Sequence, residues 1–174
     1  PRILGQLAKD SNAFVREAVA QNPSTHPRTL KQLSRDINQW VREAVARNRN
    51  TPPRALEWLA QDASQWVRGI VAQNPKTPKH VLEQLTKDDA PHVRKEAAGN
   101  PHTPVEALIL MLEDEDPLAS GGAAQALLRR LGELRFDNPP QKLLVLGRIW
   151  EKLPSDSDRA ILVRSPLWKR VWEK

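Results

Sequence analysis

The sequence contains no cysteine among its 174 residues, which excludes a disulfide framework, a thiolate metal site and a cysteine nucleophile. Its four histidines, His26, His80, His92 and His102, include no pair four residues apart that would place two imidazoles on one helix face. No segment approaches the roughly 18 to 20 consecutive apolar residues of a membrane-spanning helix, and no basic region precedes an apolar run at the N-terminus. We therefore expect a cytoplasmic protein without membrane insertion, metal or cofactor.

Reactive arrangements are also missing. The sequence has no recognisable nucleophile–base pair, no glycine-rich phosphate loop and no paired carboxylates that stand apart from the repeat pattern described below. An enzyme of the kind that hydrolyses damaged bases from DNA with helical repeats would need a Trp and a free carboxylate. Every Asp near a Trp belongs to the repeat pattern, so no enzyme activity is expected.

What the sequence has instead is a period of 26 residues. Four Val-Arg pairs recur at this spacing, with leucine in two further columns and aspartate in another. The columns are Val15, Val41, Val67 and Val93; Leu4, Leu30, Leu56, Leu82 and Leu108; Leu7, Leu33, Leu59, Leu85 and Met111; and Asp10, Asp36, Asp62, Asp88 and Asp114. A fixed period of this length predicts stacked structural repeats, about five in this chain. Pro1 lies inside a unit, so the first unit is incomplete, and we expect either further repeats before it or a reduced cap.

Each unit is predicted to form two short helices. In turns such as NPSTHP, Asn is expected to end one helix in the left-handed conformation and Thr to cap the next, with Pro in its first turn. A second column is suited to the N-cap of the second helix: Asn12, Asn38, Ser64, Ala90 and Asp116. Helices this short cannot bury an apolar face alone, so the units must stack into an all-α solenoid. Small residues in the column Ala20, Ala46, Ala72, Ala98 and Ala124 allow neighbouring helices to approach closely.

Asp and Arg recur six residues apart in the first four units. The pairs are Asp10 with Arg16, Asp36 with Arg42, Asp62 with Arg68, and Asp88 with Arg94. Because the pairing follows the period, we interpret it as a structural ladder in which each Arg donates to an Asp of its own or an adjacent unit. The ladder is predicted to end at the fifth unit, where Ser120 stands in the Arg column.

The segment LAQDASQWVRGIVAQNPKTPKHVLEQL, residues 59–85, resembles the leucine-rich repeat variant family, a HEAT-like bacterial helical repeat with the pattern VR-x-x-VA-x-N-x-x-TP-x-x-x-L-x-x-L. The resemblance covers about residues 1–116. It implies a right-handed superhelix of short helices that acts as a binding scaffold. The units are slightly longer than is usual for the variant. The iron–sulfur cluster known in one branch of the family is not expected in this chain, which has no cysteine.

Beyond residue 116 the period is lost. We predict that residues 117–174 form a degenerate last repeat and a helical C-terminal cap, in one structural domain with the array of residues 1–116. A long helix is expected to run to about Arg135, and another to begin after Asp137 or Asn138 and stop at Pro154. Trp168 and Trp172 lie four residues apart, as a helix covering the last repeat would need. A docking surface is the alternative role for these two rings.

The net charge of +6 lies in the repeat array. Residues 1–104 contain 16 Lys and Arg against 10 Asp and Glu, whereas residues 105–174 contain 11 of each. Some of the arginines are assigned to the ladder. The remaining basic residues include Arg28 and Arg54 at the start of first helices and Arg47 near a turn, so they recur along the stack. Such a stripe could meet an acidic protein or a nucleic-acid backbone.

An aromatic column, Phe14, Trp40, Trp66 and His92, precedes the Val-Arg pairs. It has two interpretations. Either each ring seals the joint between units, which the periodicity favours, or the rings form a row of anchors for a partner. Trp58 departs from the Gln of its column and is a candidate for a specific contact. The predicted binding surface therefore comprises this column with Trp58, Arg28, Arg54 and Arg47. A protein partner is the first hypothesis for it, and nucleic acid is the alternative.

Overall fold

The computed structural model describes residues 2–134 and 139–172, apart from the side chains of 139, 140 and 170–172, and these residues form helices and turns only. Five helix pairs come first: α1 (Arg2–Leu7) and α2 (Ala13–Gln21), α3 (Pro27–Leu33) and α4 (Gln39–Arg47), α5 (Pro53–Leu59) and α6 (Gln65–Gln73), α7 (Lys79–Leu85) and α8 (Pro91–Gly99), α9 (Val105–Met111) and α10 (Pro117–Arg129). A 3₁₀ turn, η1 (Leu131–Glu133), and three helices follow: α11 (Pro139–Lys152), α12 (Asp156–Arg164) and α13 (Pro166–Trp172).

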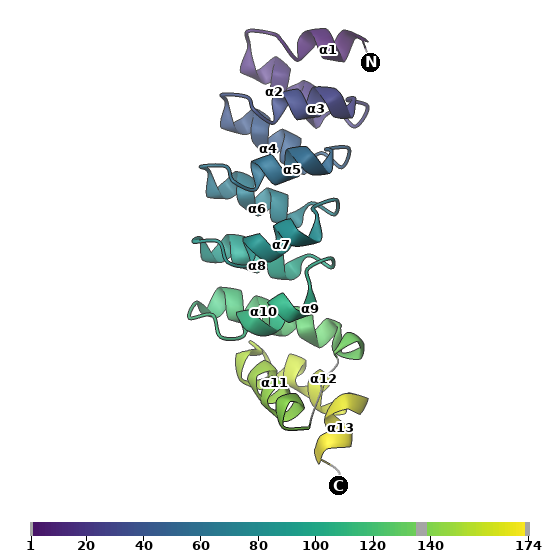
Figure 1. Cartoon of the computed structure of the whole chain (residues 1–174), viewed down its shortest axis with the longest axis vertical. Helices are drawn as coiled ribbons and strands as arrows, with labels where there is room; N and C mark the ends of the chain where they lie inside the picture. Colours follow the sequence, from purple (N-terminus) through teal and green to yellow (C-terminus); the bar gives the residue numbers. More distant parts are fainter. Residues whose placement is uncertain (1, 135–138, 173–174) are drawn as a thin grey trace.

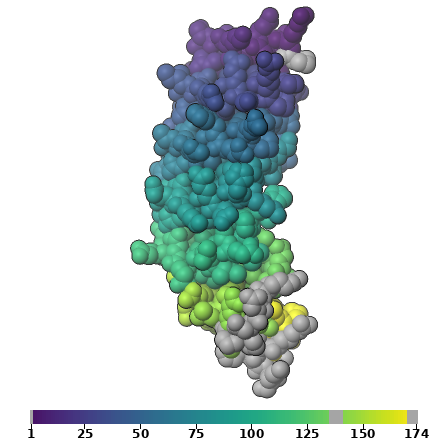
Figure 2. Space-filling view, in the orientation of Figure 1, coloured from purple at the N-terminus to yellow at the C-terminus, as the bar shows by residue number. Residues whose placement is uncertain are grey.

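The helix pairs stack along the long axis of the molecule in chain order (Figure 1). Second helices of successive units pack directly on one another, from α2 through α4, α6 and α8 to α10. In the space-filling view the colours of the sequence follow one another as bands, so each unit contacts its neighbours in sequence (Figure 2). This arrangement is an α-solenoid of two-helix repeats, as the period predicted.

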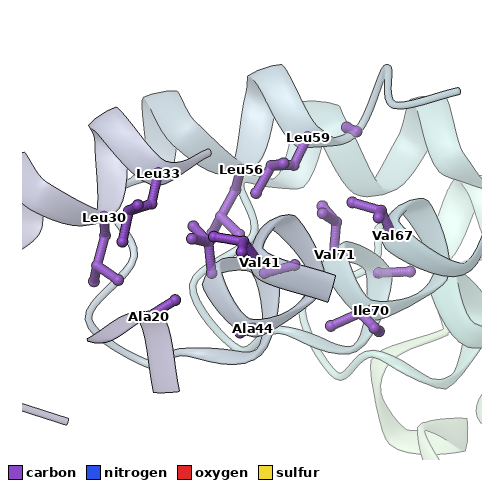
Figure 3. Packing of buried hydrophobic residues seen from close by; sticks show 14 of the residues in the cluster. Ala20, Leu30, Leu33, Val41, Ala44, Leu56, Leu59, Val67, Ile70 and Val71 are labelled. Carbon is purple, nitrogen blue, oxygen red and sulfur yellow. The ribbon is translucent and has the colours of Figure 1, made fainter. Parts of the chain in front are cut away.

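The core runs the length of the stack between first and second helices. Leucines of the first helices, such as Leu56 and Leu59, point toward valines of the second helices, such as Val41 and Val67 (Figure 3). All five members of the alanine column are at most 1% exposed, which confirms their predicted role in close helix packing. A methyl group at this position lets consecutive second helices touch along their backbones.

The turns between units differ from the prediction in two ways. The Asn residues that end second helices, for example Asn48 with φ −71°, have extended rather than left-handed backbones. Their side chains reach back one unit: Asn48 Nδ2 donates to the carbonyl of Ala20 at 2.7 Å, and Asn74 repeats the bond to Ala46 at 2.6 Å. A position that forms a bond between units needs the extended conformation, which a left-handed cap would not give.

The Thr residues of these turns do not cap the following helix. The hydroxyl of Thr51 donates to the carbonyl of Val45 at the end of the preceding helix, and the equivalent Thr of the other turns does the same. These hydroxyls therefore add a second donor to carbonyl groups of the last helical turn, which also accept from the backbone N–H of the Asn that ends the helix. The N-cap of the next helix is His26, Pro52, Pro78 or Pro104, and only His26 supplies a side-chain acceptor.

The second helices begin where the sequence predicted. The side chains of Asn12, Asn38 and Asp116 accept hydrogen bonds from amides of the first turn, whereas Ser64 and Ala90 make no such bond. The preceding Asp supports the start as well, since Asp88 Oδ1 accepts from the amide of Ala90 at 2.9 Å. A helix start without a capping side chain is thus held by the Asp column.

The Asp–Arg ladder is confirmed, and it joins adjacent units. Arg42 Nε lies 2.6 Å from Asp62 Oδ2, its Nη2 donates to Oδ1, and its Nη1 donates to the carbonyl of Asp36 in its own unit. The same arrangement joins Arg16 to Asp36, Arg68 to Asp88 and Arg94 to Asp114. Each guanidinium therefore bonds its own turn through a carbonyl and the next turn through a carboxylate.

The array ends at α10, where Ser120 bonds to the carbonyl of Asp116 instead of extending the ladder. Helix α10 stops at Arg129, not near Arg135 as predicted, because η1 intervenes. Helices α11 and α12 pack on α10, and α13 packs on α11 and α12. The predicted cap at 137 or 138 and the side chain of Trp172 lie outside the described residues. The division of the chain at residue 116 stays a prediction.

Within α13, Trp168 contacts Trp150 of α11 at a ring-centroid distance of 5.5 Å. Its ring therefore meets another cap helix. Helices α11 and α12 pack on the last repeat, and Trp168 packs against the apolar cluster that contains residues of α10.

Candidate binding surface

The carboxylates of the ladder are fully engaged in holding the stack. The hydrogen bond from Arg16 lowers the pKa of Asp36, and the bond from Arg94 does the same for Asp114. At Asp88 burial raises the pKa, but the bonds from Arg68 and from the Ala90 amide outweigh it and the pKa is lowered. These groups stay ionised and paired, so the chain does not present them as proton donors or acceptors for a reaction.

Within residues 2–134 and 139–172, no three His, Asp or Glu side chains gather in a way that could hold a metal ion. Among the helices of the same residues, none has the length and the apolar character needed to cross a membrane. The exposed aromatic side chains are the remaining candidates for a binding site.

The aromatic column lies on the outer side of the second helices. Phe14 is 79% exposed, Trp40 62% and Trp66 60%, whereas His92 is partly buried. Rings that sealed the joints between units would be buried, so the structural interpretation that the periodicity favoured is wrong for these three. Exposed indoles at equivalent positions of two adjacent helices are unusual in a molecule whose other packing residues are buried.

A groove of about 770 Å³ connects two of these rings across helices α4, α6 and α8. We call it the Trp40–Trp66 groove. Of the predicted surface residues it contains Trp40, Arg47, Trp66 and His92. Trp66 and His92 touch at a centroid distance of 5.0 Å, and no ring contact joins Trp40 to Trp66 in the described part of the chain. Both indoles therefore line the groove without stacking on each other.

The groove also contains residues that sequence reasoning missed, chiefly Glu43, Glu96 and Gly69. Glu43 accepts a bond from Gln39 at 2.9 Å, and Glu96 accepts one from Gln73 at 2.9 Å. The sequence does mark such positions by their variation between units: the column of Glu43 holds Glu, Glu, Gly and Lys in successive units. Gly69 lies beside His92, whose Cδ2 would be in ordinary contact, at 3.5 Å, with a Cβ at this position.

The remaining predicted surface residues lie elsewhere. Trp58, on α5, is 54% exposed and lies under the guanidinium of Arg35 at 4.5 Å, in a separate hollow beside the Arg42–Asp62 pair. Arg28 and Arg54 are exposed near the N-termini of α3 and α5, and neither they nor Phe14 line the hollows that hold Trp40, Trp66 and Trp58. The structure thus divides the predicted surface into two faces.

Stacked helix pairs, a continuous core and ladders between units define the class of this protein, an α-solenoid built from short repeats. Comparison with known proteins then specifies the repeat. Residues 13–36 and 40–64 match the model of the leucine rich repeat variant family, which confirms the resemblance inferred from the repeat pattern.

One solved structure agrees with this match. It is described as "a leucine-rich repeat variant with a novel repetitive protein structural motif" and is 28% identical with a TM-score of 0.61, over 84% of this chain and 60% of the other. The chain thus spans less than two thirds of that relative. An engineered protein, 17% identical, shares the fold with a TM-score of 0.53 over 98% of this chain and 94% of its own. No relative was found among curated proteins.

Proposed function

We propose that this chain is a scaffold that binds a protein partner, and that the Trp40–Trp66 groove is its binding surface. The observation that carries the proposal is the pair of large, exposed indoles beside a groove on adjacent second helices. Tryptophan is enriched among residues that dominate binding energy at protein interfaces. Trp40 is 62% and Trp66 60% exposed, so most of each indole is free to contact a partner.

The charges of the groove favour a protein over a nucleic acid at this position. Two carboxylates, from Glu43 and Glu96, share the groove with a single guanidinium, that of Arg47. A phosphate backbone would meet net repulsion there, and phosphate contacts supply most of the affinity for nucleic acids. A protein segment can carry basic, polar and apolar groups together, so it can satisfy both indoles and both carboxylates.

Selection from a library of random twelve-residue peptides displayed on phage tests this proposal. The full chain is the target, and the Trp40→Ala/Trp66→Ala variant is used to remove peptides that bind other surfaces. We expect peptides that bind the unchanged chain and lose at least about tenfold in affinity for the variant, which corresponds to the loss of one interface anchor. The Trp58→Ala variant serves as the control and should bind them unchanged. Peptides that bind both Trp variants equally would contradict the proposal.

Nucleic acid remains the alternative function, because of the exposed basic residues on the first helices. Arg28 and Arg54 occupy equivalent positions of α3 and α5, away from the two groove carboxylates. Fluorescence anisotropy with labelled single-stranded and double-stranded oligonucleotides at low salt measures whether the chain binds nucleic acid. Binding that weakens steeply with salt and is lost in an Arg28→Gln/Arg54→Gln variant would favour nucleic acid. Absence of binding at low salt would eliminate it.

A further inference from the structure

Glu43 is the least expected side chain in the groove. It is 7% exposed and lines the groove. Its bond partner is the neutral amide of Gln39. A buried carboxylate with only a neutral partner is costly, because burial removes the water that stabilises the charge. A cation of a binding partner that bonded to the Glu43 carboxylate would offset this cost.

Arg42 attracts the carboxylate of Glu43 electrostatically, but its hydrogen bonds go to other groups. Arg42, its neighbour in sequence, is bonded to Asp62 and to the carbonyl of Asp36. Arg47 lies one turn further along α4, and neither Glu43 nor Glu96 forms an ion pair with it in the described part of the chain. A carboxylate has about four acceptor positions, so each of the two keeps most of its capacity for a donor that enters the groove.

The rings beside these carboxylates suit a flat cation. Consecutive helices of a stack lie roughly 8 to 10 Å apart, whereas a planar group held between two rings needs roughly 7 to 8 Å. The indoles of Trp40 and Trp66 both line the groove and make no ring contact with each other among the described residues, whereas Trp66 and His92 touch. A guanidinium stacks on indole through its face and donates to carboxylates through its edge. His92 Nε2, buried and without a partner, offers one further polar contact.

We propose that the groove recognises an arginine side chain of the protein partner. Its guanidinium lies between Trp40 and Trp66 and donates to Glu43, with Glu96 adding to the negative potential. This inference rests on the proposed function and specifies the chemistry of the partner. The groove would then prefer a positively charged ligand, whereas the array, which is basic as a whole, would attract a negatively charged one.

The direct test is a titration followed by NMR of the indole N–H signals, of which the chain has six. The probe is Nα-acetyl-arginine methylamide, and its matched control is the citrulline compound, which has the same shape without the charge. The signals of Trp40 and Trp66, assigned with Trp→Phe variants, are expected to move with the arginine compound at concentrations at which the citrulline compound leaves them in place. Equal shifts with both, or no shift with arginine, would overturn the inference.

Three variants test how charges in the groove change the affinity for the arginine probe. Glu43→Gln is expected to weaken binding of the arginine probe by about tenfold, as for a lost bond to a charged group. Arg47→Gln is expected to strengthen it, because a like charge leaves the groove. Glu17→Gln is the matched control, since Glu17 occupies the same column and accepts the same kind of bond, from Gln21 at 2.9 Å, outside the groove. An Arg47→Gln variant that binds the probe more weakly would contradict the proposal.

The Glu96→Gln variant tests the charge effect at a position where the substitution is not expected to disturb folding, because Glu96 is less buried than Glu43. It should weaken the probe in the same direction with an unchanged thermal unfolding midpoint. The phage selection separates the two proposals. Groove-binding peptides that show no enrichment in arginine would leave the proposed function standing and overturn this inference, whereas failure to obtain any groove-dependent peptide would contradict both.

Discussion

The repeat array and the C-terminal helices are held together by different kinds of contact. Between consecutive units of the array, a guanidinium reaches the next carboxylate at 2.6 Å, and from the second helix pair on an Asn amide also reaches the previous backbone. Between α10, α11, α12 and α13 the contact is apolar, through residues such as Leu146, Ile149 and Leu162. The ion pairs in this part, such as Arg159 with Asp156, are largely exposed.

The difference reflects what each region has to specify. Each unit of the array contacts only its neighbours, so the directional bonds at each joint fix how one unit is placed on the next. The end of the array has one correct arrangement already, because α11 and α12 cover a single surface. We therefore expect substitutions of the bonding residues to be costly in the array and nearly neutral in the cap.

The largest effect is expected from the Asn residues. Asn74→Ala removes the bonds from its amide to the carbonyls of Ala46 and Asn48 and from the Lys76 amide to its oxygen, all in a buried position. Buried groups left without partners cost about 1 to 3 kcal/mol each, so we expect a loss of about 2 to 4 kcal/mol in the free energy of unfolding. Urea denaturation measures it. Asn50→Ala, whose amide bonds to the exposed carbonyl of Pro23, is the control and should lose less than about 1 kcal/mol.

The second effect compares ion pairs of the two regions. Arg68→Met leaves the nearly buried carboxylate of Asp88 without its guanidinium, and we expect a loss of about 2 kcal/mol. Asp156→Asn removes an exposed pair with Arg159 in the cap and should change stability by less than about 0.5 kcal/mol. The same urea experiment measures both. Equal losses for the two variants would contradict the distinction between the regions.

The ladder also predicts how stability depends on pH. The pKa values of Asp36, Asp88 and Asp114 are lower in the folded chain than the ordinary value of 3.8. The folded state thus binds protons less readily than the unfolded chain, and the stabilisation is complete above pH 4 to 5 and lost as pH falls through the lowered pKa values. Urea midpoints should be constant from pH 7 to 5 and decline below about pH 4. The Arg68→Met variant should decline less steeply, and a parallel decline would show that the ladder is not the cause.

The smallest effect on stability is expected at the proposed binding surface. Trp40→Ala removes a ring that is 62% exposed and makes no ring contact among the described residues. Exposed positions of this kind change stability by about 0.5 kcal/mol or less. A thermal unfolding midpoint within about two degrees of the unchanged chain is the expected result, and a larger drop would indicate that the ring seals a joint after all.

Features that repeat along the chain could be predicted from the sequence, whereas features without a repeated counterpart could not. Helix positions, the leucine and alanine columns, and the Asp–Arg ladder were predicted because each recurs at 26 residues. The role of Asn48 was not, because its bond partner is in another unit and the local pattern of a helix end gave no indication of it. The end of α10 was misjudged for a related reason, since η1 has no repeated counterpart.

The candidate surface shows the same limit. Trp40 and Trp66 were identified from their column, but their exposure depends on the helix face that the stack leaves uncovered. Glu43 and Glu96 belong to different columns, and the groove joins them only because α4 and α8 lie on either side of α6. Residues that vary between units become a site when the units are stacked, and a single sequence does not give that arrangement.

The central claim is that the ladders hold the stack and leave the Trp40–Trp66 groove free to bind a partner. One variant, Trp40→Ala/Trp66→Ala, measured for both urea unfolding and affinity for the groove-selected peptides, tests it most directly. The claim predicts an unfolding free energy within about 1 kcal/mol of the unchanged chain together with at least a tenfold loss of affinity. A variant that unfolds much more readily, or that binds the peptides as well as before, would contradict it.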